Sequence, residues 1–200
     1  MDRFLRIAIP TMFAGIALAL LYAVFSASSK GSNRDPVAKL ATGQLAKLDL
    51  SDRGAAGATA PFVDIDGNSL TLQDFQGQSV LINFWATWCG PCEREMPSLA
   101  ALETSRGDEF FKVIAISVDS PEDTDYAKQR LRELSGGVLE FYTLAEGPDG
   151  WNVVYDMGAG GGFPTTILYD KDGLKIGKIE GEADWASYEA VALVDVIKGD

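Results

Sequence analysis

The only two cysteines of this 200-residue chain stand close together, as Cys89 and Cys92. Such a pair can cycle between a dithiol and a disulfide, although the same spacing also serves metal ligation and haem attachment. A structural zinc site needs four ligands, usually with further Cys or His, whereas the chain contains no His. Covalent haem requires His directly after the second Cys, and Glu93 stands there instead. The residues therefore favour thiol–disulfide exchange, with no metal and no organic cofactor.

The residues around the pair predict a strand, a tight turn and a helix. Residues 79–85 form a short apolar run of the kind that builds a strand buried on both faces. Pro91 fits only the first turn of a helix, so Cys89 is expected at the N-terminus of a helix that continues to about residue 104. The unpaired N–H groups and the dipole at that end favour the thiolate, which would lower the pKa of Cys89 from its ordinary value of about 8.5.

A long apolar stretch lies near the N-terminus. Residues 7–25 contain no charged side chain, and a helix of that length covers most of a hydrocarbon core of about 30 Å. Arg3 and Arg6 precede it and favour an N-terminus that stays in the cytoplasm. A cleaved signal peptide is the alternative, but its apolar core is usually only about 7–15 residues long. We therefore expect residues 1–30 to be a single-pass anchor in the cell inner membrane, with the C-terminal domain in the periplasm.

The remainder of the chain is acidic. Residues 31–200 carry 14 basic and 28 acidic side chains, a net charge of −14. This balance disfavours nucleic acid and anionic membrane surfaces as partners, because both reward clustered Lys and Arg. Residues 31–58 are small, polar and charged, and they predict a linker with a short helix near residues 37–48. One domain over residues 59–200 follows, large enough to bury a core of its own.

Strand and helix patterns alternate through this domain. Besides the strand at residues 79–85, buried strands are expected at residues 112–118 and 141–144, with a hairpin at each end of the domain around Gly67 and Gly173. Helices are expected at residues 121–135, at residues 151–155, and from about Trp185 with Asp184 as its cap. The fold class should be α/β, a central mixed sheet with helices on both faces. This is a thioredoxin-like architecture.

Residues 84–97, which read F-W-A-T-W-C-G-P-C-E-R-E-M-P, resemble the active-site signature of a known family. It is the group of membrane-anchored periplasmic thioredoxin-like reductases that includes TlpA, ResA and CcmG. The resemblance covers residues 59–199 and is closest to the TlpA branch through residues 181–185. It implies a protein-disulfide reductase whose clients are exported proteins of cytochrome oxidase or cytochrome c biogenesis. It also implies a membrane electron donor that regenerates the dithiol.

The resemblance implies roles for residues outside the cysteine pair. Pro164 matches the cis-proline that faces the disulfide, and with Phe163 and Thr165 it would bind an extended stretch of client. Glu95 follows Cys92 by about one helical turn and matches the carboxylate that takes the Cys92 proton. A solvated Glu on the helix surface is the alternative interpretation of Glu95.

Tryptophan and asparagine residues near the pair complete the prediction. Trp88 should shield the disulfide and contact clients, because an exposed indole adds apolar area to a docking surface. Trp151 and Trp185 look structural. Asn83 stands where thioredoxin has a buried Asp, and an amide cannot accept a proton, so the function of the base falls to Glu95 or to water.

Two other classes of function remain open from the sequence. A peroxidase of the same fold would use one reactive Cys with Thr or Ser three residues before it, where this chain has Ala86. Two thiolates could instead hold Cu(I), although the chain contains no His and offers no Met near the pair beyond Met96. A peroxidase assay and a stoichiometric metal titration would distinguish these classes from a disulfide reductase.

Overall fold

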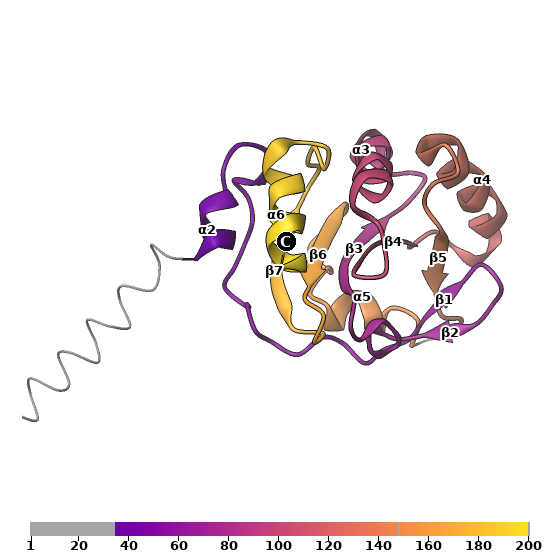
Figure 1. The fold of residues 1–200 in the computed structure, drawn as a ribbon. Coiled ribbons are helices and arrows are strands. Elements are labelled where there is room, and N and C mark those ends of the chain that lie inside the picture. Colours follow the sequence, from indigo (N-terminus) through magenta and orange to yellow (C-terminus); the bar gives the residue numbers. More distant parts are fainter. Residues whose placement is uncertain (1–34, 148, 200) are drawn as a thin grey trace, which may run out of the picture. The chain divides into compact units, whose positions relative to one another are not determined.

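The computed structural model describes residues 35–147 and 149–199 (Figure 1). Residues from Leu40 onwards form one compact domain, and a short helix, α2 (Pro36–Leu40), precedes it in the chain. The predicted anchor over residues 1–30 lies outside the described residues. Within the described ranges, no helix is long and apolar enough to cross a membrane.

A seven-stranded mixed sheet forms the centre of the domain. Its order is β2-β1-β5-β4-β3-β6-β7, which can be followed from right to left in Figure 1. The inner strands β3, β4 and β5 are parallel, while the other pairs are antiparallel. The strands are β1 (Phe62–Asp64), β2 (Ser69–Leu70), β3 (Ser79–Trp85), β4 (Phe111–Ser117), β5 (Phe141–Leu144), β6 (Thr165–Tyr169) and β7 (Lys175–Glu180). The expected mixed sheet with a hairpin at each end is confirmed.

Helices cover both faces of the sheet. On one face α6 (Tyr188–Lys198), α3 (Gly90–Arg106) and α4 (Thr124–Ser135) lie in a row, and α5 (Asn152–Asp156) lies on the other face (Figure 1). Ion pairs join the neighbours in the row, Arg106 with Asp195 and Arg130 with Glu93. Within the described residues there are also three short 3-10 helices, η2 (Gly43–Leu45), η3 (Leu72–Phe75) and η4 (Pro121–Asp123).

Two helices begin later than the sequence predicts. Pro121 opens the 3-10 turn η4, and α4 follows only from Thr124. The last helix begins at Tyr188 with Ser187 as its N-cap, not at Trp185 with Asp184 as cap. In the segment before this helix, the backbone N–H of Trp185 donates to the Ser98 hydroxyl at 3.1 Å.

The outer edge of β7 is covered by residues 49–57. Asp49 and Lys178 exchange two backbone hydrogen bonds of 2.8 and 2.9 Å, and the Gly54 N–H donates to the Lys175 carbonyl at 2.7 Å. The approach is close, because a Cβ on Gly177 would meet the Asp49 carbonyl oxygen at 3.0 Å. Part of the stretch that the sequence assigns to a linker thus packs against the sheet. The boundaries 1–30, 31–58 and 59–200 stay predictions.

Candidate active site

Cys89 and Cys92 are joined in a disulfide at the N-terminus of α3. Cys89 is the N-cap, as expected, and its Sγ accepts the backbone N–H of Cys92 at 3.3 Å. Pro91 occupies the first turn, where its missing N–H leaves no helical bond unmade. Cys92 is fully buried, whereas Cys89 keeps 5% of its surface exposed. Cys89 is therefore the sulfur that a client can reach, and the helix N-terminus favours its thiolate.

A buried carboxylate that sequence reasoning missed holds the loop before Cys89. Asp119, which follows β4, accepts the Thr87 hydroxyl at 2.7 Å and the Thr87 backbone N–H at 3.1 Å. It also accepts the Ser117 hydroxyl at 2.8 Å. Because Thr87 stands two residues before Cys89, Asp119 fixes the path of the loop that presents the nucleophile. No sequence pattern marks it, since an Asp after a buried strand is ordinary.

An aromatic surface adjoins the disulfide loop. Trp88 is 66% exposed, and its ring lies edge-on to Phe163 with centroids 6.0 Å apart. The Phe163–Pro164 bond is cis, as expected. Trp151, which the sequence suggests is structural, is 39% exposed and lies 6.3 Å from Phe163, with Tyr155 next to it at 6.1 Å. The aromatic surface, defined as Trp88, Phe163, Trp151 and Tyr155, is thus larger than the sequence predicts.

Thr165 contributes to this region in another way than expected. Its side chain is wholly buried, and its hydroxyl donates to the Gly162 carbonyl at 2.7 Å. In β6 it stands between Phe84 and Glu180 of the neighbouring strands. Thr165 therefore fixes the loop before the cis-proline and offers no side-chain contact to a client.

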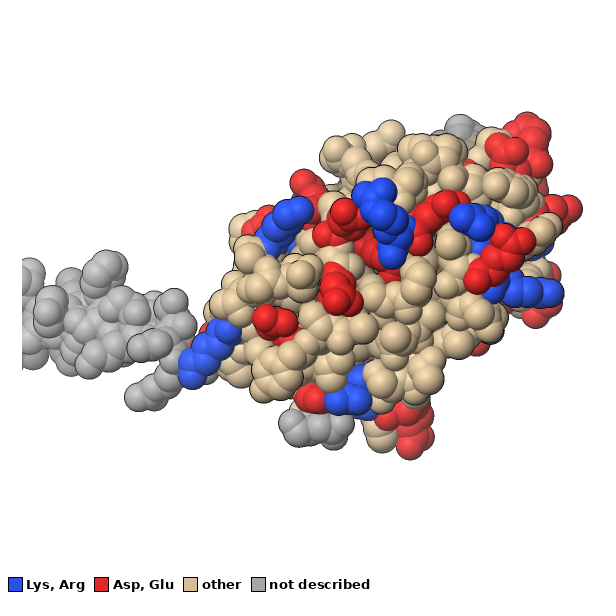
Figure 2. All heavy atoms as spheres, turned by 90° about the horizontal axis from the view of Figure 1, so that it is seen from above, with Lys and Arg blue, Asp and Glu red and all other residues tan. Residues whose placement is uncertain are grey.

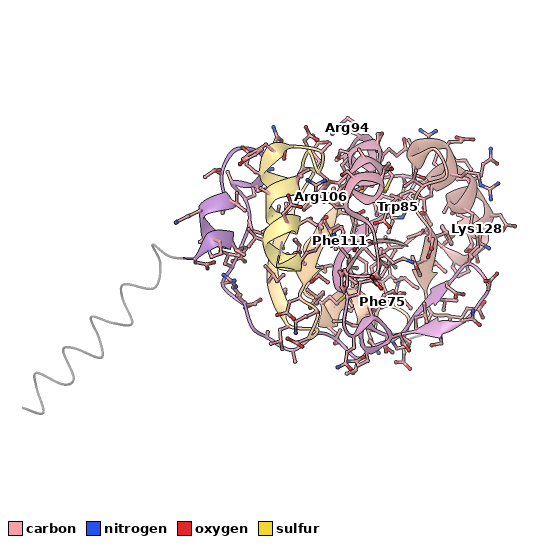
Figure 3. The ribbon with its side chains drawn as sticks, viewed as in Figure 1. Phe75, Trp85, Arg94, Arg106, Phe111 and Lys128 are labelled. Carbon is pink, nitrogen blue, oxygen red and sulfur yellow. A yellow bond between two sulfur atoms is a disulfide. The ribbon has the colours of Figure 1, made fainter. Side chains whose placement is uncertain are left out.

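A cavity of about 690 Å³ opens beside Trp88 and Trp151, between the first hairpin and α4. The residues that line it are largely apolar, but four of them carry charged side chains. The apolar members include Ile65, Val118, Pro121 and Leu144, and the charged members are Asp64, Asp119, Lys128 and Glu146. Lys128 lies on α4 in Figure 3.

Glu95 lies on α3 itself and is buried in the core, with 3% of its surface exposed. Its Oε1 accepts the Asn83 Nδ2–H at 2.7 Å, and its Oε2 accepts the Ala183 N–H at 3.1 Å and the Trp185 Nε1–H at 3.2 Å. Burial raises the pKa of Glu95 to about 7, and these hydrogen bonds oppose that rise. Glu95 is therefore not a solvated residue on the helix surface. Trp185 donates a hydrogen bond to it, a role that the sequence did not reveal.

The comparisons with known proteins agree with this geometry. Residues 53–176 match the AhpC/TSA family. The chain belongs to the AhpC/TSA family. Its curated relatives include the thiol-disulfide oxidoreductases ResA of Bacillus thuringiensis (strain Al Hakam), 34% identical over 119 residues, and of Bacillus cereus (strain ATCC 10987 / NRS 248), 32% identical over 141 residues. These matches cover 60% and 70% of this chain, and 64% and 76% of the relatives.

A solved structure supports the thioredoxin-like fold of this AhpC/TSA protein. The thioredoxin domain of a thiol-disulfide oxidoreductase from Bacteroides vulgatus is 25% identical and superposes with a TM-score of 0.59. The match covers 72% of this chain and 96% of that chain. The disulfide, the cis-proline and the relatives thus agree on thiol–disulfide chemistry.

Charged side chains around the site of this AhpC/TSA protein are paired with each other. Arg94, on the outside of α3 (Figure 3), contacts Glu182 at 2.7 Å, and Glu93 contacts Arg130 at 2.6 Å. Hydrogen bonding to Arg130 lowers the pKa of Glu93. Figure 2 shows acidic and basic side chains side by side on that face, without a patch of one sign. Neither Arg94 nor Arg130 is left to stabilise a thiolate on Cys89.

Proposed function

We propose that the protein is a protein-disulfide reductase that acts on exported clients. The observation that carries the proposal is the placement of Cys89, slightly exposed at a helix N-terminus and next to the exposed Trp88 and the cis-proline. The thiolate of Cys89 attacks a client disulfide, and one client sulfur leaves and takes up a proton. The buried Cys92 then attacks Cys89 Sγ, which releases the second client thiol and leaves the enzyme oxidised. Two electrons pass to the client in each cycle.

Glu95 takes the proton of Cys92 in the second step. It follows Cys92 by three residues on α3, so their Cβ atoms are about 5–6 Å apart. A buried thiol has a raised pKa and is a poor nucleophile until it loses its proton. A carboxylate with a pKa of about 7 is matched to accept that proton near neutral pH.

The aromatic surface binds the client next to its cysteine. Pro164 has no N–H, and its carbonyl already accepts the Gly181 N–H at 2.8 Å. We therefore assign main-chain pairing with an extended client segment to Phe163, while Trp88 covers the client sulfur. The cavity beside Trp88 and Trp151 receives the following client residues.

The finer assignment is a TlpA-like reductase, anchored in the inner membrane through residues 1–30 and facing the periplasm. The uncharged residues 7–25 support the anchor, and residues 181–185, which hold Glu95, support the TlpA branch. Its clients are oxidase-assembly proteins or apocytochromes. A membrane electron donor returns the dithiol, because an exported domain cannot reach reductants of the cytosol.

Trapping of the mixed disulfide tests this function. In a Cys92→Ser variant the second step is blocked, so a client should accumulate on Cys89 and be found by mass spectrometry. The matched Cys89→Ser variant keeps only the buried sulfur and should trap little. Equal trapping by both variants would overturn the assignment of nucleophile and resolving cysteine.

A further inference from the structure

The surroundings of Glu95 satisfy only one of its two protonation states. As a carboxylate it accepts three N–H donors, from Asn83, Ala183 and Trp185. A backbone N–H and an indole N–H cannot accept a hydrogen bond. If Glu95 takes up a proton at one of the three sites that these donors occupy, the new O–H points at a donor. Protonation at such a site must therefore break a hydrogen bond or change the partner.

Asn83 is the partner that can change. It is fully buried, and its Nδ2 donates to Glu95 at 2.7 Å and to the Thr166 hydroxyl at 2.9 Å. Its Oδ1 is buried and, within the described part of the chain, has no hydrogen-bond partner. An amide carries an acceptor and a donor of nearly the same size, so a half-turn exchanges them with little change in packing.

The reversed amide fits a protonated Glu95. Oδ1 would then accept the O–H of Glu95 and the O–H of Thr166, whose hydroxyl accepts from Asn83 now and donates to no other described residue. After the reversal, Nδ2 lies in the position that Oδ1 occupies now. Like Oδ1, it has no hydrogen-bond partner there. Both protonation states thus keep two hydrogen bonds to Asn83, and in each state one polar atom of the amide lacks a partner.

Among the described residues, only Asn83, Ala183 and Trp185 form hydrogen bonds with the Glu95 carboxyl. From its own helix α3 come Cys92, held in the disulfide, and Arg94, paired with Glu182. β3 and β6 present the neutral side chains of Asn83 and Thr166. The loop before α6 presents Glu182 and Asp184, which line a hollow of about 330 Å³ with Glu95, and the charge of Glu182 disfavours the ionised form.

We propose that Asn83 is a positioning residue whose amide reverses as Glu95 gains or loses its proton. The inference deepens the proposed function, because the proton in question is the one that Glu95 takes from Cys92. The reversal keeps the carboxyl hydrogen-bonded in both states, so Glu95 can exchange its proton without leaving its place in the core.

The first test follows the amide directly in the oxidised full-length chain. With Asn labelled by ¹⁵N, nuclear Overhauser effects between the Nδ2 hydrogens of Asn83 and the Thr166 side chain should be present above the titration midpoint of Glu95 and lost below it. The Glu95 midpoint is read from its ¹³Cδ shift. Effects that persist unchanged on both sides of that midpoint would overturn the reversal.

A second test measures what the amide does to Glu95. Asn83→Ala removes a partner that the reversal supplies in both protonation states, so the Glu95 midpoint should rise by less than about one pH unit, because the bond to the ionised carboxylate is the stronger of the two. The matched control is Ser135→Ala, which removes another buried group without a partner and should leave the midpoint unchanged. A rise of about one to two pH units in Asn83→Ala would mean that Asn83 serves the ionised form alone, and it would contradict the reversal. Neither test uses a client, so their outcome is independent of the trapping experiment. The amide reversal can be disproved while Cys92→Ser still traps a client, and trapping can fail while the amide is shown to reverse.

Discussion

Glu95→Gln should change how the stability of the fold depends on pH. In the unfolded chain the Glu95 carboxyl has an ordinary pKa of about 4.5, and burial raises it to about 7 in the folded protein. Between these two values the folded state holds a proton that the unfolded state has released. The free energy of unfolding therefore falls as pH rises through this range, by about 1.4 kcal/mol for each pH unit. The whole loss is about 3 kcal/mol and is complete above pH 7.

The Gln variant has no proton to lose at this position. Its amide is close in size to the carboxyl, and its oxygen can accept from Ala183 and Trp185 while its nitrogen faces Asn83. All other ionisable groups are the same in the two proteins, so their contributions cancel in the difference. The stability of Glu95→Gln relative to the parent should then rise by about 3 kcal/mol between pH 4 and pH 8.

Denaturant unfolding of the oxidised proteins, at half-unit steps between pH 4 and pH 8, measures this difference. Glu109→Gln, at an exposed position, serves as the control and should follow the parent at every pH. A stability difference between Glu95→Gln and the parent that stays constant across the range would refute the burial argument. A difference that grows below pH 4.5 would mean that the sign of the effect is wrong.

Three further predictions concern the catalytic cycle. Glu95→Gln should slow resolution of the mixed disulfide and remove the inflection near pH 7 from its pH–rate profile, while stopped-flow traces of the first attack change little. Asp119→Ala should lower the free energy of unfolding by about 1–3 kcal/mol and speed hydrogen exchange at the Thr87 N–H, and unaltered exchange would contradict its part in holding the loop. The reduction potential should lie below about −200 mV, because Arg94 and Arg130 are engaged by Glu side chains, and a value near −120 mV in a glutathione titration would mean that the protein inserts disulfides.

Local features of the sequence were enough for the centre of the fold. The run of residues 79–85 predicts β3 with its observed bounds, because a short, continuous apolar stretch between polar turns is typical of a strand that is buried on both faces. Pro91 likewise places Cys89 at a helix N-terminus without knowledge of any tertiary contact.

The state of Glu95 could not be predicted in this way. Its burial depends on Ala183 and Trp185, which lie 88 and 90 residues further along the chain. Trp185 itself lies before the last helix, which begins at Tyr188. Thr165 has a suitable position next to the cis-proline, but its register in β6 directs its side chain into the core. Such outcomes follow from packing between distant segments, which short motifs do not encode.

The strip of residues 49–57 along β7 bears on how the protein behaves in bulk. An edge strand with free N–H and C=O groups is a template on which another molecule can add a strand, and this is a common start of aggregation. Here the chain occupies that template itself, through its bonds to Lys175 and Lys178. At the opposite edge, β2 is only two residues long and offers little to pair with. A chain shortened to begin at residue 59 would uncover β7, so a soluble fragment for biochemistry should begin no later than Leu40.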